Sequence, residues 1–254
     1  HQIEVEDFQI AKLPDSAQAV IFSGAHQGSN NPLVVEAQAK LIPTFSLAQA
    51  IGMLSTKKET LAVCGVGGKS TTSALLSWIF EVAGEDLSFA VGVGDIPNLQ
   101  TCARWQTNSD KLVIEADEYV ADPQADLTPR FLYLRPSHII CTSLAFDHPD
   151  VYDSFEETKL AFQNFFQLLP SEGQLIINGD DAELVELVNQ AQPQYLTIGE
   201  FSTNDVQLQD WQVKDGVASV DLVAQGDLLG EPVVRLEINL PGRHNLRNSA
   251  YAAV

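Results

Sequence analysis

The stretch that decides the fold is Thr60-Leu61-Ala62-Val63-Cys64-Gly65-Val66-Gly67-Gly68-Lys69-Ser70-Thr71-Thr72. Residues 60–64 are mostly apolar and predict a buried strand. Three glycines and a lysine follow, after which Leu75, Leu76, Ile79 and Phe80 recur at helical spacing. A strand, a glycine-rich turn and a helix in this order predict a mononucleotide-binding α/β unit.

The glycine-rich turn suits a phosphate ligand. Glycines let backbone N–H groups approach an anion closely, and the helix start adds partial positive charge. Lys69 can reach the β- and γ-phosphates of ATP, and the Ser70 hydroxyl can bind Mg²⁺. The turn is not a full Walker A motif, because Val63 holds the place of its first glycine. The alternative interpretation is a glycine-rich turn with an exposed lysine.

Net charge restricts the kind of partner. The 254 residues include 14 basic and 34 acidic ones, a net charge of −20, and no Lys or Arg lies between Lys159 and Lys214. Such a surface repels polyanions, so neither nucleic acid nor a membrane is an expected partner. An anionic ligand must instead be bound by local cations, of which Lys69 is the first candidate.

Cysteine usage and hydropathy favour a cytoplasmic protein. Cys64, Cys102 and Cys141 show no paired spacing, which is typical of free thiols in a reducing compartment. No apolar run approaches the ~20 residues of a membrane span. The start of the chain, His1–Glu6, is polar and acidic and lacks the pattern of a secretory signal. The sequence does not indicate an oligomeric state.

Strands and helices alternate along the rest of the chain. Residues 18–58 predict two strand–helix units, whose helices begin at Asn31-Pro32 and at Ser46. Further strands are expected at 111–114, 138–141 and 174–177, and a helix is expected from Ser154 to Leu169.

This alternation predicts an α/β fold with a doubly wound, mostly parallel sheet. Short β-rich runs over 205–240 predict an antiparallel flap. Two strand–helix units cannot cover a sheet on both faces, so residues 1–58 are expected to be part of a Rossmann-like domain that precedes the central domain at 59–254.

Three further motifs carry side chains suited to chemistry. Glu115-Ala116-Asp117-Glu118 and Asp147-His148-Pro149-Asp150 each follow a strand, at the sheet edge where α/β proteins bind ligands and metals. Residues 242–248 bring His244, Asn245 and Asn248 near one helical turn, where amides can contact an adenine edge. The alternatives are an acidic loop, a structural histidine and helix capping by Asn245.

Together the four motifs resemble the Mur ligases, the ATP-dependent amide-forming enzymes of peptidoglycan precursor synthesis. The family patterns G-x-x-G-K-[ST]-T, E-A-D-E, D-H-x-D and G-x-H-N-x-x-N correspond to residues 65–71, 115–118, 147–150 and 242–248. Residues 130–136 and 146–148 look most like the branch that uses UDP-N-acetylmuramate. That branch contains the L-alanine-adding ligase and a recycling ligase that adds a murein tripeptide.

The resemblance implies a reaction in which ATP phosphorylates the acceptor carboxylate and an amine displaces phosphate from the acyl phosphate. ATP and Mg²⁺ are the implied cofactors, and UDP-N-acetylmuramate with an amino acid or peptide the implied partners. Lys69 and His148 are the implied catalytic residues, and Ser70, Glu118 and His148 the implied metal ligands. The implied nucleotide contacts are Gly65, Val66, Gly67, Gly68, Lys69, Ser70, Thr71, His244, Asn245 and Asn248.

The sequence departs from this branch at a few positions. Family loops usually read G-T-H-G-K-T-T-T, whereas Val66, Gly67 and Ser70 differ, and Ser143 and Ala145 replace an Asn and a Glu. Ser70 keeps the hydroxyl. The departures leave open a catalytically degenerate ATP-binding module, and an unrelated P-loop NTPase is a third possibility.

The resemblance also implies a domain organisation. The family has three domains, so residues 1–58 are expected to be part of the UDP-sugar-binding domain and 59–254 the central ATP-binding domain. The C-terminal amine-binding domain is expected to be absent from this chain, which is then not expected to be active alone.

Overall fold

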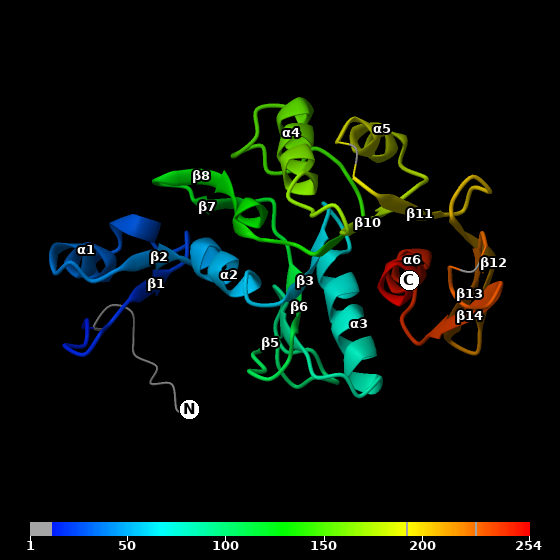
Figure 1. The fold of residues 1–254 in the computed structure, drawn as a ribbon, viewed down its shortest axis with the longest axis horizontal. Coiled ribbons are helices and arrows are strands. Elements are labelled where there is room, and N and C mark those ends of the chain that lie inside the picture. The colour runs from blue at the N-terminus through cyan, green and yellow to red at the C-terminus, as the bar shows by residue number, and fades with distance from the viewer. Residues whose placement is uncertain (1–11, 192, 227) are drawn as a thin grey trace.

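The computed structural model describes residues 12–191, 193–226 and 228–254 (Figure 1). The expectation about a secretory signal rests on His1–Glu6, which lie outside these residues. Within the described residues, a ten-stranded sheet has the order β14-β13-β12-β11-β10-β9-β3-β6-β4-β5. Six of its nine strand pairings are parallel and three are antiparallel. This confirms the α/β fold with a mostly parallel sheet.

The strands of this sheet have the following bounds: β3 Glu59–Cys64, β4 Ser88–Ala90, β5 Ala103–Arg104, β6 Lys111–Glu115, β9 His138–Cys141, β10 Gln174–Asn178, β11 Tyr195–Gly199, β12 Val206–Lys214, β13 Val217–Ala224 and β14 Val233–Ile238. Its helices are α3 Lys69–Val82, α4 Phe155–Phe166, α5 Ala182–Ala191 and α6 Arg243–Ala253. The flap expected over 205–240 is the antiparallel β12–β14 unit, and it continues the main sheet because β12 pairs with β11 in parallel.

Helices cover both faces of the sheet, as a doubly wound fold requires. Strand β3 shows how the faces divide, because Ala62 and Cys64 pack with α4 and α5 whereas Val63 packs with α3 and α6. Side chains alternate across a strand, so these two sets belong to separate cores. The strand residues are buried on both faces, which explains why residues 60–64 form an almost continuous apolar run.

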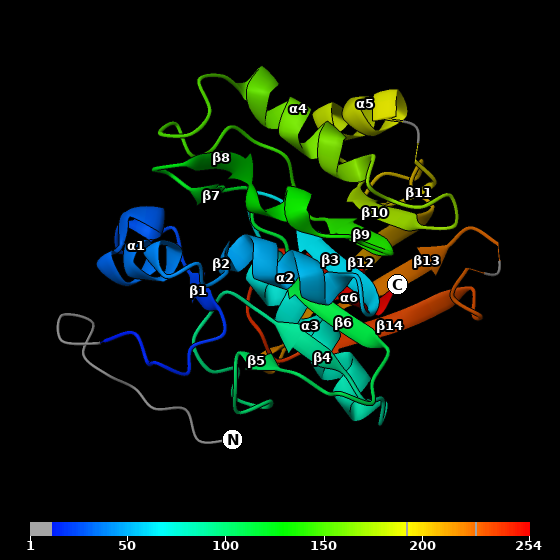
Figure 2. The same ribbon diagram turned by 60° about the vertical axis from the view of Figure 1, so that its left-hand side comes forward.

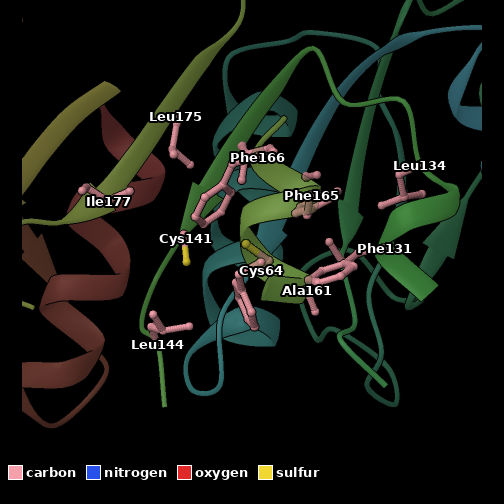
Figure 3. Close-up of a cluster of buried hydrophobic side chains, with 14 of the residues drawn as sticks. Cys64, Phe131, Leu134, Cys141, Leu144, Ala161, Phe165, Phe166, Leu175 and Ile177 are labelled. Atoms are coloured by element: carbon pink, nitrogen blue, oxygen red, sulfur yellow. The ribbon is translucent and has the colours of Figure 1, made fainter. Parts of the chain in front are cut away.

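Aromatic rings fill the core beneath α4 (Figure 3). Phe131 stacks on Phe165 with ring centroids 4.5 Å apart and meets Phe162 edge to face at 5.3 Å. All three side chains are fully buried. Phe131 belongs to the 3₁₀ helix η2 (Arg130–Tyr133), so this packing fixes the segment that follows the Glu115–Glu118 motif.

The N-terminal residues form a separate, smaller layer. It consists of β1 (Val20–Phe22), the 3₁₀ helix η1 (Gly28–Asn30), α1 (Pro32–Ala39), β2 (Thr44–Ser46) and α2 (Leu47–Ser55), and β1 and β2 pair in parallel. The expected helix starts are confirmed, with Asn31 capping α1 and Ser46 forming a capping box with Gln49.

An antiparallel hairpin, β7 (Val120–Asp122) and β8 (Asp126–Pro129), lies beside α2 in both ribbon views (Figure 2). It ties the N-terminal layer to the central sheet. The buried Asp122 carboxylate accepts the Ser29 N–H at 2.9 Å, and Ser55 Oγ accepts the Arg135 N–H at 3.0 Å. The division of the chain into domains at 1–58 and 59–254 stays a prediction.

Several sequence-based expectations differ from the structure in detail. On α3, Leu76 is buried as expected, but Ile79 is 40% exposed, and the helix also buries the polar residues Thr72, Ser73 and Ser77. Helix α4 ends at Phe166, before the expected Leu169, because residues 167–169 form a turn. Strands β4, β5, β7, β8 and β11 were not predicted.

The expectation for the cysteines is confirmed at two positions. Cys64 and Cys141 are buried free thiols, and burial raises the pKa of the Cys64 thiol well above its usual range. No helix in the described part of the chain is both long and apolar enough to cross a membrane.

The aromatic core gives a stability prediction. Replacing Phe165 by alanine should lower the free energy of unfolding by about 3–5 kcal/mol, because a fully buried ring that stacks on Phe131 is lost and leaves a cavity. Leu160→Ala on the same helix is the matched control, since Leu160 is 55% exposed, and should change stability by less than about 0.5 kcal/mol. Urea denaturation followed by circular dichroism measures both. Equal effects would contradict the assignment of this face of α4 to the core.

Candidate active site

The glycine-rich loop runs from the end of β3 to the start of α3 and contains two glycines that cannot be replaced without strain. Gly65 has φ +123° and Gly68 has φ +88°. A Cβ atom on Gly65 would lie 2.4 Å from Thr142 Oγ1, and one on Gly68 would lie 2.6 Å from Asn248 Oδ1. Gly68 is also the residue that precedes helix α3, so its backbone conformation sets the direction in which the helix begins.

Side chains at the end of β9 hold the loop in place. Thr142 Oγ1 lies 2.5 Å from Gly67 O, and Ser143 Oγ accepts the Gly67 N–H at 2.9 Å. Two of the positions that depart from the family pattern, Gly67 and Ser143, therefore contact each other. A Cβ atom on Gly67 would meet only Ser143 Oγ, at 3.9 Å, so packing does not require glycine there.

Lys69 forms an ion pair with a buried carboxylate. Its Nζ lies 2.9 Å and 2.8 Å from the two carboxylate oxygens of Glu118, whose side chain is only 1% exposed. Tyr152 donates its hydroxyl proton to the backbone carbonyl of Glu118 at 2.6 Å. Burial, and then the nearby Glu118 charge, raise the pKa of Tyr152 well above its usual range, so this phenol stays a donor.

Ser70 contacts Glu115 rather than Glu118. The Ser70 hydroxyl donates to Glu115 Oε1 at 2.9 Å, and Glu115 Oε2 accepts the Gly92 N–H at 2.7 Å. The family resemblance implied Ser70 and Glu118 as metal ligands but did not include Glu115. In the structure the serine is instead paired with the first carboxylate of the same motif, a residue that the sequence-based site did not include.

A second group of donors includes Glu118, the ion-pair partner of Lys69. One ligand atom each from Asp117, Glu118 and His148 falls within 4.8 Å of the others, and His148 Nε2 is 3.5 Å from Glu118 Oε1. His148 has φ +54°, a conformation that costs energy for a non-glycine residue and is common at functional sites. Two carboxylates and an imidazole suit a divalent cation. His148 and Glu118, both expected as metal ligands, are thus brought together.

Lys69, Glu115, Asp117 and His148 border a cavity of about 680 Å³ between the N-terminal layer and the central sheet. The residues that line the cavity come from three parts of the chain. The N-terminal layer contributes Ser23, Gly24, Ala25, Leu47, Ala48 and Ile51; the central sheet and helix α3 contribute Lys69, Ala90, Val91, Gly92, Ile114, Glu115, Ala116 and Asp117; and later segments contribute Ala121, Arg130, Phe131, Leu134, Asp147 and His148.

The third motif lies at the start of α6, and only part of it reaches the loop. Asn248 is 8% exposed and adjoins Gly68. His244 is exposed, and Asn245 donates from Nδ2 to Pro241 O at 2.6 Å. The alternative in which Asn245 caps the helix is wrong, because Gly242 is the residue at the cap position. Contacts of His244, Asn245 and Asn248 with adenine stay a prediction.

The fold and the site define a nucleotide-binding α/β protein, and comparison with known proteins assigns its family. Residues 63–254 match the Mur ligase middle domain. The chain therefore belongs to the Mur ligases, a family of ATP-dependent amide ligases.

Individual relatives agree with this assignment. The chain is 30% identical over 247 residues to the UDP-N-acetylmuramate–L-alanine ligase of Desulfitobacterium hafniense, covering 97% of this chain and 51% of that protein. A structure of the UDP-N-acetylmuramate:L-alanyl-γ-D-glutamyl-meso-diaminopimelate ligase from Neisseria meningitidis superposes with a TM-score of 0.77 at 26% identity, over 93% of this chain and 72% of that one.

A more distant structure, the MurF ligase from Thermotoga maritima in complex with ADP, shares the fold with a TM-score of 0.61 at 16% identity, over 92% of this chain and 52% of that one. The chain spans about half the length of the curated relatives it matches.

The loop geometry gives a second prediction. Gly65→Ala should destabilise the protein by about 1–3 kcal/mol and weaken ADP binding, because a Cβ atom cannot coexist with Thr142 Oγ1 and φ +123° is strained for alanine. Gly67→Ala is the matched control for stability, since a methyl group there would meet only Ser143 Oγ, at 3.9 Å. Urea denaturation and titration with a fluorescent ADP analogue measure the two effects. If both substitutions left the free energy of unfolding unchanged, the described loop conformation would be wrong.

Proposed function

We propose that the protein carrying this chain joins the carboxylate of UDP-N-acetylmuramate to L-alanine, using ATP and an acyl phosphate intermediate. One observation carries the proposal: Lys69 of the glycine-rich loop lies at the border of a 680 Å³ cavity that also contains the Asp117 and His148 donors. A phosphate-binding group and a carboxylate-rich metal site therefore share one chamber with room for an acceptor.

The loop and Lys69 supply the nucleotide end of the reaction. An oxygen of the acceptor carboxylate attacks the γ-phosphorus, the bond to the β,γ-bridging oxygen breaks, and ADP leaves with that electron pair. Negative charge grows on the transferred and leaving oxygens, so a positioned ammonium group and loop N–H groups lower the barrier. The amine then adds to the acyl phosphate, and phosphate leaves as the amide forms.

Two donor sets in the site fit divalent cations. The Ser70 hydroxyl and Glu115 carboxylate, already 2.9 Å apart, would hold Mg²⁺ beside the loop, and Asp117, Glu118 and His148 would hold a second ion. Bound Mg²⁺ supplies charge neutralisation at phosphate and carboxylate oxygens. Glu118 remains a proposed ligand of the second site, while Glu115 replaces it as the partner of Ser70.

The acceptor would occupy the cavity next to the N-terminal layer. Ser23, Gly24 and Ala25 border that side, and Leu47 with Ile51 add apolar surface. We assign residues 1–58, which include this layer, to the UDP-sugar-binding domain and residues 59–254 to the ATP-binding domain. A cytoplasmic location follows from the supply of ATP and UDP-sugar that the reaction needs.

A second acceptor chemistry has support of its own. The Neisseria meningitidis structure is that of a ligase named for UDP-N-acetylmuramate and a tripeptide. The present chain superposes on 72% of its length. The same carboxylate activation followed by attack of a murein tripeptide amine is therefore the alternative to L-alanine addition. A catalytically degenerate module is less well supported, because the loop, Lys69 and both donor sets are intact.

An assay of the full-length protein tests the proposal. ADP release should require UDP-N-acetylmuramate, Mg²⁺ and either L-alanine or the tripeptide, and the effective amine names the ligase. Lys69→Ala should lower kcat by about 10²–10³-fold, the typical cost of removing one charge-stabilising donor. Lys57→Ala is the matched control, since Lys57 is an exposed lysine away from the cavity. Nucleotide binding without turnover on either amine would favour the degenerate module, and ADP release that ignores UDP-N-acetylmuramate would favour an unrelated NTPase.

A further inference from the structure

The cavity contains a second permanent cation, Arg130, that the reaction described above does not use. Among the described residues, Lys69 and Arg130 are the only Lys or Arg side chains that border the cavity. Lys69 is held by Glu118 and belongs to the phosphate-binding loop. In a protein with a net charge of −20, an anionic acceptor needs a local cation, and Arg130 is the one that remains.

The guanidinium of Arg130 is already fixed in position. Nε donates to Val120 O at 3.1 Å, and Nη1 donates to Asp117 Oδ2 at 2.6 Å. The Tyr119 ring lies 5.4 Å from the guanidinium carbon, at the outer range of a cation–π contact. These contacts restrict the side chain before any ligand arrives, so little conformational entropy remains to be lost on binding.

Part of the hydrogen-bonding capacity of Arg130 is unused. A guanidinium carries five N–H donors, and the two contacts above occupy one on Nε and one on Nη1. No described residue accepts a hydrogen bond from Nη2. The remaining donors on Nη1 and Nη2 form a fork that matches the two oxygens of a carboxylate. The Asp117 contact also places this fork beside the Asp117–Glu118–His148 donor group.

We infer that Arg130 binds the carboxylate of the acceptor and orients it for phosphorylation. The inference rests on the proposed function and adds the residue that recognises the reacting group. Arg130 selects a carboxylate-bearing sugar nucleotide over one that lacks this group. A purely structural Arg130, bracing Asp117 and Val120, would instead affect all ligands alike through stability.

Equilibrium binding to the full-length protein separates these roles. The two probes are UDP-N-acetylmuramate and UDP-N-acetylglucosamine, which lacks the lactyl carboxylate. Isothermal titration calorimetry should show that Arg130→Ala weakens UDP-N-acetylmuramate binding by about 10- to 100-fold, the range for a charge-assisted hydrogen bond. The affinities for UDP-N-acetylglucosamine and ADP should change by less than about twofold, and Arg130→Lys should retain part of the preference because lysine keeps the charge without the fork.

Arg135→Ala is the matched control, because Arg135 follows the same 3₁₀ helix but is exposed and donates only to backbone carbonyls at 132–134. It should keep the full preference for UDP-N-acetylmuramate. If Arg130→Ala keeps that preference, or weakens all three ligands equally, the inference is wrong and the proposed function stands. If the wild-type protein does not bind UDP-N-acetylmuramate more tightly than UDP-N-acetylglucosamine, the proposed acceptor is wrong. The role inferred for Arg130 is then wrong as well.

Discussion

The buried carboxylate of Glu118 constrains the whole site. Its side chain is 1% exposed, burial of a carboxylate is unfavourable without a close cation, and Lys69 provides one with two hydrogen bonds. The pair joins the first residue of α3 to the segment after β6, and so aligns the glycine-rich loop with the carboxylates at the sheet edge. Removal of one partner from such a pair typically costs about 3–5 kcal/mol, since an uncompensated charge remains buried. The pair is therefore costly to break once it has formed, and it fixes the placement of the loop.

This pairing also links the two kinds of ligand that the site suits. Lys69 cannot neutralise Glu118 and a phosphate group to the same degree, because one ammonium charge is shared between them. Another cation near Glu118 would release Lys69 toward the phosphate, and Asp117 and His148 supply further donors for such an ion within 4.8 Å. For the proposed function, charge balance therefore favours nucleotide and divalent cation arriving together, as in known phosphoryl-transfer sites.

Local sequence signals predicted the parts of the fold that depend on local physics. The strand, loop and helix over 60–82 and the helix start at Ser46 follow from residue types a few positions apart. The partner of Ser70 depends instead on sheet register: Glu115 pairs with Val63, at the base of the loop, whereas Glu118 lies three residues further on. No sequence pattern within one segment shows which of these two carboxylates lies close to Ser70. The β7–β8 hairpin was missed for a similar reason, since its Asp122 is stabilised by Ser29 of the N-terminal layer.

The departures from the family pattern look different once their surroundings are known. Gly67 has room for a side chain, yet its N–H is accepted by Ser143, so the two unusual residues form one contact that holds the loop. Ala145 is exposed and does not border the cavity, whereas Asp117, Glu118 and His148 are all present. A site that no longer functions would be expected to lose first the residues that are unfavourable for stability. Here the buried Glu118 charge and the strained His148 backbone are both present, and neither is favourable for the fold alone. Their presence favours the proposed function over the degenerate module.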